Sequence, residues 1–152
     1  MNHRILGRTG IRVSEIGIGG EGFEKIGYAE SEKMIDCAME NGIDFIDIYN
    51  SNPEVRSNVG KALSRYPRES FVVEGHIGSM WENGQYRRTR EINEVAEAYG
   101  DFLERLRLKY VDIGMLHYVD TNSDYERVFG GEMIEYAKKL KKDGIIRCIG
   151  LS

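Results

Sequence analysis

The sequence predicts an α/β fold of the (β/α) barrel type, and three short segments carry this prediction. Residues 42–47, 110–117 and 143–152 are mainly apolar runs that each end in a polar side chain. A (β/α) barrel produces this pattern because it places reactive groups at the carboxyl ends of its strands. A parallel strand that no helix follows leaves an unpaired edge. We therefore expect the 152 residues to form one domain, the front part of a larger barrel.

Glycine-bounded segments define the first predicted elements. Residues 4–6 and 11–13 flank Gly7-Arg8-Thr9-Gly10, which predicts a β-hairpin that plugs one end of the barrel. Residues 16–20 predict the first parallel strand, and apolar side chains at helical spacing predict a helix over residues 31–41. Gly42 then supplies the left-handed residue that ends this helix.

The next two strand–helix units follow the same order. Residues 43–48 predict the second strand, and Asn52 followed by Pro53 predicts the N-cap and first residue of the second helix. Residues 71–75 predict the third strand. A polar loop that contains Trp81 then leads to a long amphipathic helix over residues 92–106.

The last third of the chain continues the alternation of strands and helices. Residues 111–116 predict the fourth strand, residues 125–142 a single helix, and residues 145–151 the fifth strand. Nearly continuous apolar strands that alternate with helices are typical of a parallel sheet covered by helices. The predicted fold is therefore an N-terminal hairpin followed by about five strands of a (β/α)8 TIM-type barrel.

Composition excludes several classes of partner. The net charge is −4, and the 21 basic and 25 acidic residues are interleaved without a basic stripe. Nucleic acid and anionic membranes are therefore not expected partners. The two cysteines lack C-x-x-C spacing, which fits a reducing compartment. Because no apolar run approaches the length of a signal peptide or a membrane span, we expect a soluble, cytoplasmic protein.

Four polar side chains are predicted to share the inner face of the barrel at the carboxyl ends of three strands. Period-two alternation places Asp47, Glu74, His76 and His117 there. Two imidazoles and two carboxylates in a partly dry site can exchange protons near neutral pH or ligate a metal. The competing interpretation is a buried polar cluster that only satisfies its own hydrogen bonds.

The hairpin carries a recognisable pattern, Leu6-Gly7-Arg8-Thr9-Gly10 followed by Val13-Ser14-Glu15-Ile16-Gly17. From this hairpin to the fifth strand the chain resembles the amino-terminal part of an aldo-keto reductase. The resemblance implies a (β/α)8 barrel that reduces aldehydes and ketones with NADP(H). It also implies a catalytic tetrad of aspartate, tyrosine, lysine and histidine.

The resemblance implies an altered tetrad in this chain. The aspartate falls on Asp47 and the histidine on His117, but Asn52 stands at the tyrosine position and His76 at the lysine position. Tyr49 is displaced from the tyrosine position by three residues. Asparagine cannot protonate the alkoxide that hydride transfer creates, and loss of a positioned acid costs about 10²- to 10⁴-fold in rate. His76 can replace the charge of the lysine or serve as the acid.

Three hypotheses about function follow. The first is an NADP-linked oxidoreductase that acts on carbonyl compounds through this altered tetrad. The second is a metal-dependent or acid–base barrel enzyme that uses Asp47, Glu74, His76 and His117 without nicotinamide. The third is a non-catalytic scaffold or assembly subunit, which the missing acid favours.

The glycine-rich segment after the first strand is a candidate cofactor contact. Residues 17–22 fit G-x-G-x-x-G, but a loop rather than a helix follows, which argues against the dinucleotide fingerprint. The resemblance instead implies that Gly20, Glu21 and Asp47 contact the nicotinamide end of the cofactor. It also implies that Ser152 holds the carboxamide.

Substrate and partners follow from the same resemblance. We expect a small-molecule carbonyl substrate in a pocket that Trp81 and Asn52 line. The inner face of the sheet lacks a covering layer, so we expect self-association or completion by a missing C-terminal half of the barrel. The residues predicted to lie uncovered on that face are Ile16, Ile18, Phe45, Val72, Ile113 and Met115.

Overall fold

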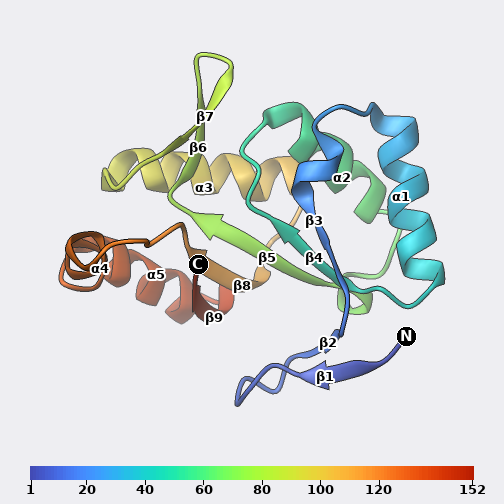
Figure 1. Ribbon diagram of the computed structural model, residues 1–152, viewed down its shortest axis with the longest axis horizontal. Coiled ribbons are helices and arrows are strands. Elements are labelled where there is room, and N and C mark those ends of the chain that lie inside the picture. Colours follow the sequence, from blue (N-terminus) through green and yellow to red (C-terminus); the bar gives the residue numbers. More distant parts are fainter.

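A parallel sheet of five strands forms the centre of the protein (Figure 1). The computed structural model describes residues 1–152. All neighbouring pairs in this sheet are parallel, as the α/β prediction requires. The strands, in their order across the sheet, are β3 (Gly17–Gly19), β4 (Phe45–Ile48), β5 (Val72–Ile77), β8 (Val111–Leu116) and β9 (Ile146–Leu151).

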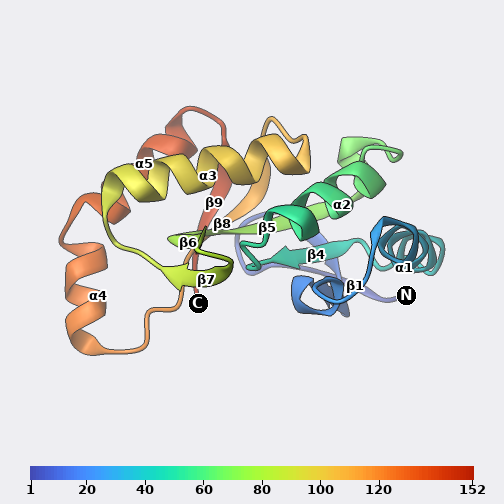
Figure 2. The same cartoon turned by 90° about the horizontal axis from the view of Figure 1, so that it is seen from above.

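Helices cover one face of this sheet, which makes it the outer face (Figure 2). No helix is both long enough and apolar enough to cross a membrane. The chain also contains two short 3₁₀ turns, η1 (Gly20–Phe23) and η2 (Arg68–Ser70). The helices are α1 (Tyr28–Glu40), α2 (Pro53–Leu63), α3 (Ile92–Leu106), α4 (Asn122–Phe129) and α5 (Glu132–Lys142).

Burial of alternate strand residues decides which side chains point to the inner face. Ile46 and Ile48 of β4 are fully buried in the core beneath the helices, so Asp47 between them points the other way. In β5, Phe102 of α3 presses on Gly75, where a Cβ atom would lie only 2.4 Å from the phenyl ring. The flanking residues of β5, Glu74 and His76, therefore face inward.

The N-terminal hairpin is confirmed and covers part of the inner face. Strands β1 (His3–Ile5) and β2 (Arg12–Ser14) pair antiparallel at the amino ends of the parallel strands (Figure 1). Ile11 and Val13 pack against Val72 and Ile113, which are only 9% and 6% exposed. The prediction that these two strand residues lie uncovered is therefore wrong, because the hairpin shields them.

The predicted inner-face positions in the first strand are also wrong. Ile18 pairs with Ile46 in the parallel register, so it lies on the helix-covered face with that residue. Ile16 precedes the strand and is 58% exposed. Glycines occupy the inward positions instead, because Gly17 and Gly19 pair with Phe45 and Asp47.

The single helix predicted over residues 125–142 is two helices, α4 and α5. Gly130 and Gly131 separate them, and Thr121 caps α4 by accepting a hydrogen bond from the Asp124 N–H. A Cβ atom on Gly130 or Gly131 would lie 2.8 or 2.6 Å from a carbonyl oxygen of the preceding turn. Only glycine permits this close passage of the backbone, so the helix ends here.

The polar loop predicted around Trp81 is a second β-hairpin. Strands β6 (Ser79–Glu82) and β7 (Gln85–Arg88) are joined by Asn83 and Gly84, both with positive φ. Two consecutive residues in this conformation form the tight turn that suits the twist of a hairpin. Gly78, with φ of 102°, redirects the chain from β5 into β6. The hairpin therefore rises from the carboxyl end of the sheet (Figure 1).

Candidate functional site

The predicted polar side chains meet at the carboxyl ends of three neighbouring strands. The parallel register pairs Asp47 of β4 with Glu74 of β5 and places His76 opposite Met115 of β8. His117 follows β8 directly, and its backbone N–H donates to the carbonyl oxygen of Ile77. The alternation that buries the apolar neighbours against the helices thus gathers both imidazoles and both carboxylates on the inner face.

A continuous chain of hydrogen bonds runs through four side chains of the site. Asp47 Oδ1 lies 3.0 Å from His76 Nε2, and His76 Nδ1 lies 2.8 Å from His117 Nδ1. His117 Nε2 lies 2.6 Å from the hydroxyl of Tyr86 on β7. Both imidazoles are only 6% exposed, whereas the Asp47 side chain is 38% exposed and Tyr86 is 41% exposed. This chain of hydrogen bonds therefore has a buried middle and two solvent-accessible ends.

One placement of protons satisfies every bond while both imidazoles are neutral. His76 donates from Nε2 to the Asp47 carboxylate, so its Nδ1 is an acceptor. His117 then donates from Nδ1 to His76, and its Nε2 accepts from the Tyr86 hydroxyl. When a proton is added to His76, the two remaining bonds reverse direction. His76 then donates to His117, and His117 donates to Tyr86.

Surrounding charges decide which imidazole takes that proton. Burial opposes protonation of His76, but the carboxylates of Asp47 and Glu74 outweigh it, so the pKa of His76 is raised. Glu74 Oε1 lies 3.7 Å from His76 Nε2. Burial lowers the pKa of His117 to about 3, helped by the positive charges of His76 and Arg90. The extra proton therefore resides on His76.

Tyr49 contributes its ring to this cluster. The ring stacks on His117 at a centroid distance of 6.3 Å with an interplanar angle of 10°, and it meets His76 edge-on. Burial raises the pKa of Tyr49, and the nearby carboxylate of Glu21 adds to this effect. The phenol that bonds to an imidazole is that of Tyr86, which the sequence analysis did not single out. The Asn83-Gly84 turn was the signal that would have found its hairpin.

Neither predicted pocket residue lies in the hydrogen-bond chain. The Asn52 side chain accepts from the Glu54 N–H, which confirms it as the N-cap of α2. Asn52 lines a separate cavity of about 280 Å³ beside η1. Trp81 pairs with Tyr86 across the β6–β7 hairpin. It also lines a cavity of about 480 Å³ between the hairpin, α2 and α3, where the buried Arg56 lies.

The residues predicted to contact a cofactor surround the same end of the sheet. Gly20 packs on β4 so closely that a Cβ atom would lie 3.1 Å from the carbonyl oxygen of Asp47. Glu21 is exposed beside it. Ser152 Oγ accepts from the Tyr118 N–H at 2.8 Å, which leaves the serine hydroxyl proton free to donate. Exposed acceptors and a free hydroxyl donor fit a nicotinamide ring and its carboxamide.

Three of the site's side chains also form a potential set of metal ligands. Asp47, Glu74 and His76 each offer one ligand atom, and these atoms lie within 4.8 Å of one another. The His76 nitrogen among them already shares a proton with Asp47 at hydrogen-bond distance. A cation there has to displace that proton, so metal ligation by this His76 nitrogen and its hydrogen bond to Asp47 exclude each other.

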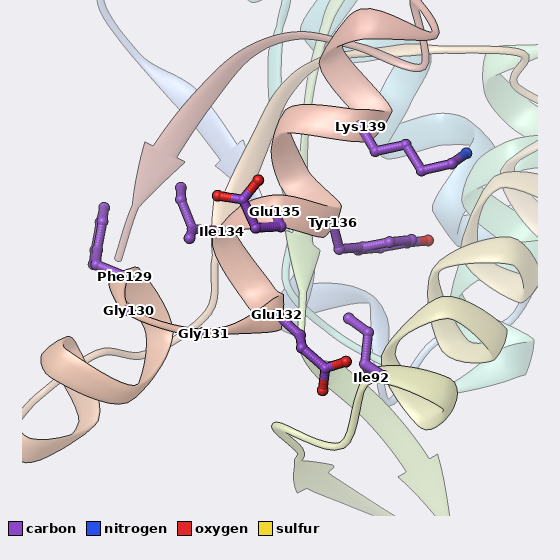
Figure 3. Close-up of a pocket in the computed structure, with 9 residues that line it drawn as sticks. All are labelled: Ile92, Phe129, Gly130, Gly131, Glu132, Ile134, Glu135, Tyr136 and Lys139. Atoms are coloured by element: carbon purple, nitrogen blue, oxygen red, sulfur yellow. The ribbon is translucent and has the colours of Figure 1, made fainter.

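A larger cavity lies elsewhere. It measures about 580 Å³ and lies between the start of α3 and the α4–α5 junction (Figure 3). Ile92, Phe129 and Tyr136 contribute apolar surface to it, and the acidic residues Glu132 and Glu135 also line it. It contains no imidazole and none of the predicted site residues, so it is separate from the candidate site.

The sequence pattern of the Aldo/keto reductase family matches residues 15–152. This chain belongs to the aldo/keto reductase family. The predicted resemblance is thereby confirmed, and the chain joins a family of oxidoreductases. The match begins at Glu15, directly after the N-terminal hairpin, and includes every strand of the parallel sheet of this aldo/keto reductase.

Two curated relatives illustrate the range of the family. The NADH-specific methylglyoxal reductase of Escherichia coli (strain K12) is 32% identical over 166 residues, which cover 95% of this chain and 50% of that protein. The L-galactose dehydrogenase of Arabidopsis thaliana is 31% identical over 157 residues, which cover 98% of this chain and 47% of that protein. This aldo/keto reductase chain spans about half the length of the curated relatives it matches.

Solved structures agree with the fold. An aldo-keto reductase from Bacillus halodurans, in its holo form, matches with a TM-score of 0.80 at 29% identity, over 100% of this chain and 50% of that one. A protein from Pseudomonas aeruginosa assigned to the same family matches with a TM-score of 0.82 at 27% identity, over 99% and 59% of the two chains. The predicted (β/α)8 TIM-barrel fold class is confirmed, and this aldo/keto reductase chain supplies five of its parallel strands.

Proposed function

We propose that this chain is the acid–base part of a nicotinamide-linked oxidoreductase that acts on carbonyl compounds. The observation that carries the proposal is the hydrogen-bond chain from Asp47 to Tyr86. It lies at the carboxyl ends of parallel barrel strands, where barrel enzymes hold their active sites. Two buried imidazoles between two exposed ends are arranged to move a proton to a bound substrate.

The tetrad of this enzyme is altered at two positions. Asp47 and His117 keep their family positions, whereas Asn52 caps α2 and His76 replaces the lysine. His76 holds a positive charge beside His117 because the carboxylates of Asp47 and Glu74 stabilise it. Asp47 therefore orients the His76 ring and stabilises its protonated form. The ring of Tyr49 packs against His117 as part of the wall of the site.

The cofactor is a nicotinamide dinucleotide, and the resemblance favours NADP(H). When bound, its reduced form supplies a hydride to the substrate carbonyl carbon. Gly20, Glu21, Asp47 and Ser152 of this chain hold the nicotinamide end. The phosphates and adenine need donors and cations from further loops of a complete barrel, so this chain alone binds NADPH weakly, with an affinity poorer than micromolar.

The substrate is a small aldehyde or ketone. One relative is named for methylglyoxal and another for L-galactose, which are small carbonyl or sugar compounds. Trp81 lies opposite Tyr86 on the hairpin, and this placement supports its role in the wall of the substrate pocket. The side-chain oxygen of Asn52 already accepts a hydrogen bond from the Glu54 N–H. The main role of Asn52 is therefore to cap α2, and a contact with substrate is secondary.

The open barrel needs a partner for its edge strands. Strands β3 and β9 each lack a neighbour on one side, and Leu151 of β9 is 46% exposed. Unpaired edges and exposed apolar side chains favour association. The remaining half of a barrel, or in its absence a second copy of the chain, covers these edges.

The experiment that tests the proposed function measures oxidation of reduced nicotinamide by the purified protein. With millimolar NADPH or NADH and methylglyoxal, we expect a substrate-dependent loss of cofactor absorbance. Asp47→Asn should reduce this rate on the order of 10²-fold. Glu69→Gln removes an exposed carboxylate at the opposite end of the sheet and should leave the rate unchanged.

Two results contradict the proposal. The first is no substrate-dependent oxidation with either cofactor across a panel of small aldehydes and ketones. The second is an equimolar transition metal in the purified protein whose removal abolishes the activity, which favours the metal-dependent alternative.

A further inference from the structure

Tyr86 is held at the site by its own hairpin rather than by a barrel strand. Arg88, two residues along β7, donates to the Tyr118 carbonyl at 2.6 Å, and Arg90 donates to the His117 carbonyl at 2.8 Å. Arg90 also forms an ion pair with Asp124 at 2.6 Å. These bonds fasten the base of the hairpin to the segment that carries His117. The Tyr86 hydroxyl is thereby fixed at His117 Nε2 while its ring remains partly open to solvent.

We propose that Tyr86 is the residue that protonates the substrate oxygen, and that His76 resupplies its proton through His117. This proposal rests on the proposed function, because it assigns the acid for that reaction. Tyr86 replaces, from a different part of the fold, the phenol that Asn52 does not provide. The relay consists of Asp47, His76, His117 and Tyr86, and these four side chains come from four separate strands or strand ends.

The relay balances as one hydride and one proton. The hydride from the reduced nicotinamide forms the new C–H bond, and the π electrons of the carbonyl move to its oxygen. That oxygen takes the proton of the Tyr86 hydroxyl, and Tyr86 takes the proton of His117 Nε2. In the same step His117 Nδ1 takes the proton of His76 Nδ1, so His117 stays neutral throughout. The products are an alcohol, oxidised nicotinamide and a neutral His76 that still donates to Asp47.

When His76 is protonated, the directions of the His76–His117 and His117–Tyr86 hydrogen bonds leave Tyr86 able to donate its proton to a substrate. With His76 protonated, His117 donates to the oxygen of Tyr86, so the hydroxyl proton of Tyr86 is free to point at a substrate. With His76 neutral, the same hydroxyl donates to His117 and cannot donate elsewhere at the same time. Protonation of His76, a buried group, therefore prepares Tyr86 at the surface of the site.

The relay also explains how Tyr86 can act as an acid although its pKa is raised. Burial raises the pKa of Tyr86, against the opposing effect of Arg88 and Arg90. A free phenolate would thus be costly in this position. Because His117 hands over its proton as Tyr86 releases its own, the phenolate need not accumulate. The lowered pKa of His117 disfavours a charged, doubly protonated His117, so this imidazole stays neutral and gives up one proton only as it takes up another.

Geometry favours Tyr86 over Tyr49 as the acid. The ring of Tyr49 lies nearly parallel to that of His117, whereas the ring of Tyr86 meets His117 at 87° with its hydroxyl at the ring nitrogen. Only the second arrangement lets an O–H group and an imidazole nitrogen exchange a proton.

The first test is ¹⁵N NMR of the imidazoles in the chain without cofactor, with pH lowered through the titration of His76. Chemical shifts of ring nitrogens report which nitrogen carries a proton. We expect His117 to be protonated at Nδ1 while His76 is neutral, and at Nε2 once His76 is charged, without becoming charged itself. A His117 that keeps one tautomer throughout, or that gains its own charge in that range, overturns the relay.

The second test is kinetic and uses three phenylalanine variants. Tyr86→Phe should lower kcat about 10²- to 10⁴-fold with little change in KM. Tyr125→Phe removes an exposed phenol on α4 and should leave both constants unchanged. Activity that survives in Tyr86→Phe, or that is lost only in Tyr49→Phe, overturns the assignment while the proposed function stands. If the wild-type protein reduces no carbonyl, the proposed function fails, and the NMR result alone decides whether the relay exists.

Discussion

The Nδ1 atoms of His76 and His117 lie 2.8 Å apart, so the two imidazoles share one proton. Neither ring can be replaced by an apolar side chain without leaving the other with a buried, unpaired nitrogen. His76→Leu and His117→Phe should each lower the free energy of unfolding by about 1–3 kcal/mol. The double variant should cost clearly less than the sum of the two, because it leaves no unpaired imidazole. Urea unfolding of the four proteins measures this coupling, and strict additivity would contradict it.

Stability at acid pH should depend on His117. Its pKa in the folded protein is lowered to about 3, whereas an unfolded histidine titrates near 6.5. As the pH falls from 6.5 toward 3, the unfolded state binds a proton that the folded state does not bind. Titration of His117 therefore lowers the free energy of unfolding across this pH range. The raised pKa of His76 acts in the opposite sense, adding stability that is lost as pH rises through its folded value.

The measurement compares unfolding free energies between pH 7 and pH 4 in the wild type and in His117→Gln. Glutamine does not titrate, so the wild type should lose more stability over this range than the variant. Equal slopes in the two proteins would show that His117 is not held neutral by the fold.

Restoring a tyrosine at the family position should not restore the acid. Asn52 caps α2, and the cavity that it lines includes neither imidazole, so we expect a larger side chain there to enter that cavity and not to contact His117. Asn52→Tyr should cost about 1 kcal/mol of stability through loss of the cap. In a Tyr86→Phe background it should leave kcat at the reduced level. Recovery of activity in that double variant would place the residue 52 side chain in the active site.

A pair of glycine substitutions tests the break between α4 and α5. A Cβ atom on Gly131 would lie 2.6 Å from a backbone oxygen, whereas one on Gly100 of α3 would meet no atom within 4 Å. Gly131→Ala should destabilise the protein by about 1–3 kcal/mol. Gly100→Ala should stabilise it by about 0.5–1 kcal/mol, because alanine favours a helix. Thermal unfolding monitored by circular dichroism distinguishes the two, and a tolerated Gly131→Ala would mean that α4 and α5 can merge.

The chain by itself should associate through its open edges. Strands β3 and β9 have free hydrogen-bonding sides, and Ile16 and Leu151 add exposed apolar surface near them. Light scattering at tens of micromolar should therefore give a mass above the 17.4 kDa of one chain. Ile16→Lys and Leu151→Lys should shift the population toward monomer. A sharp monomer peak from the unaltered chain would show that these edges are protected without a partner.

Local chemistry explains most of what could be predicted of the fold. The start of α2 follows from Asn52 and Pro53, whose capping side chain and fixed φ act within one turn. The two glycines at 130 and 131 and the Asn83-Gly84 turn are equally local signals, but a helical pattern and a polar composition concealed them. In both cases two local signals in the sequence favoured different structures, and the prediction followed the signal that the fold did not.

The sequence by itself determined the barrel fold class and the meeting of Asp47, His76 and His117. Period-two alternation places these side chains on one face of the sheet, and the parallel register places them at the same end of it. Only the tertiary structure decided that Tyr86 completes the chain of hydrogen bonds. Tyr86 and His117 are 31 residues apart, and their contact depends on the turn at Gly78 and on arginines that fasten the hairpin to the His117 segment. No local pattern encodes such a contact, because its geometry arises from packing between elements that the sequence specifies separately.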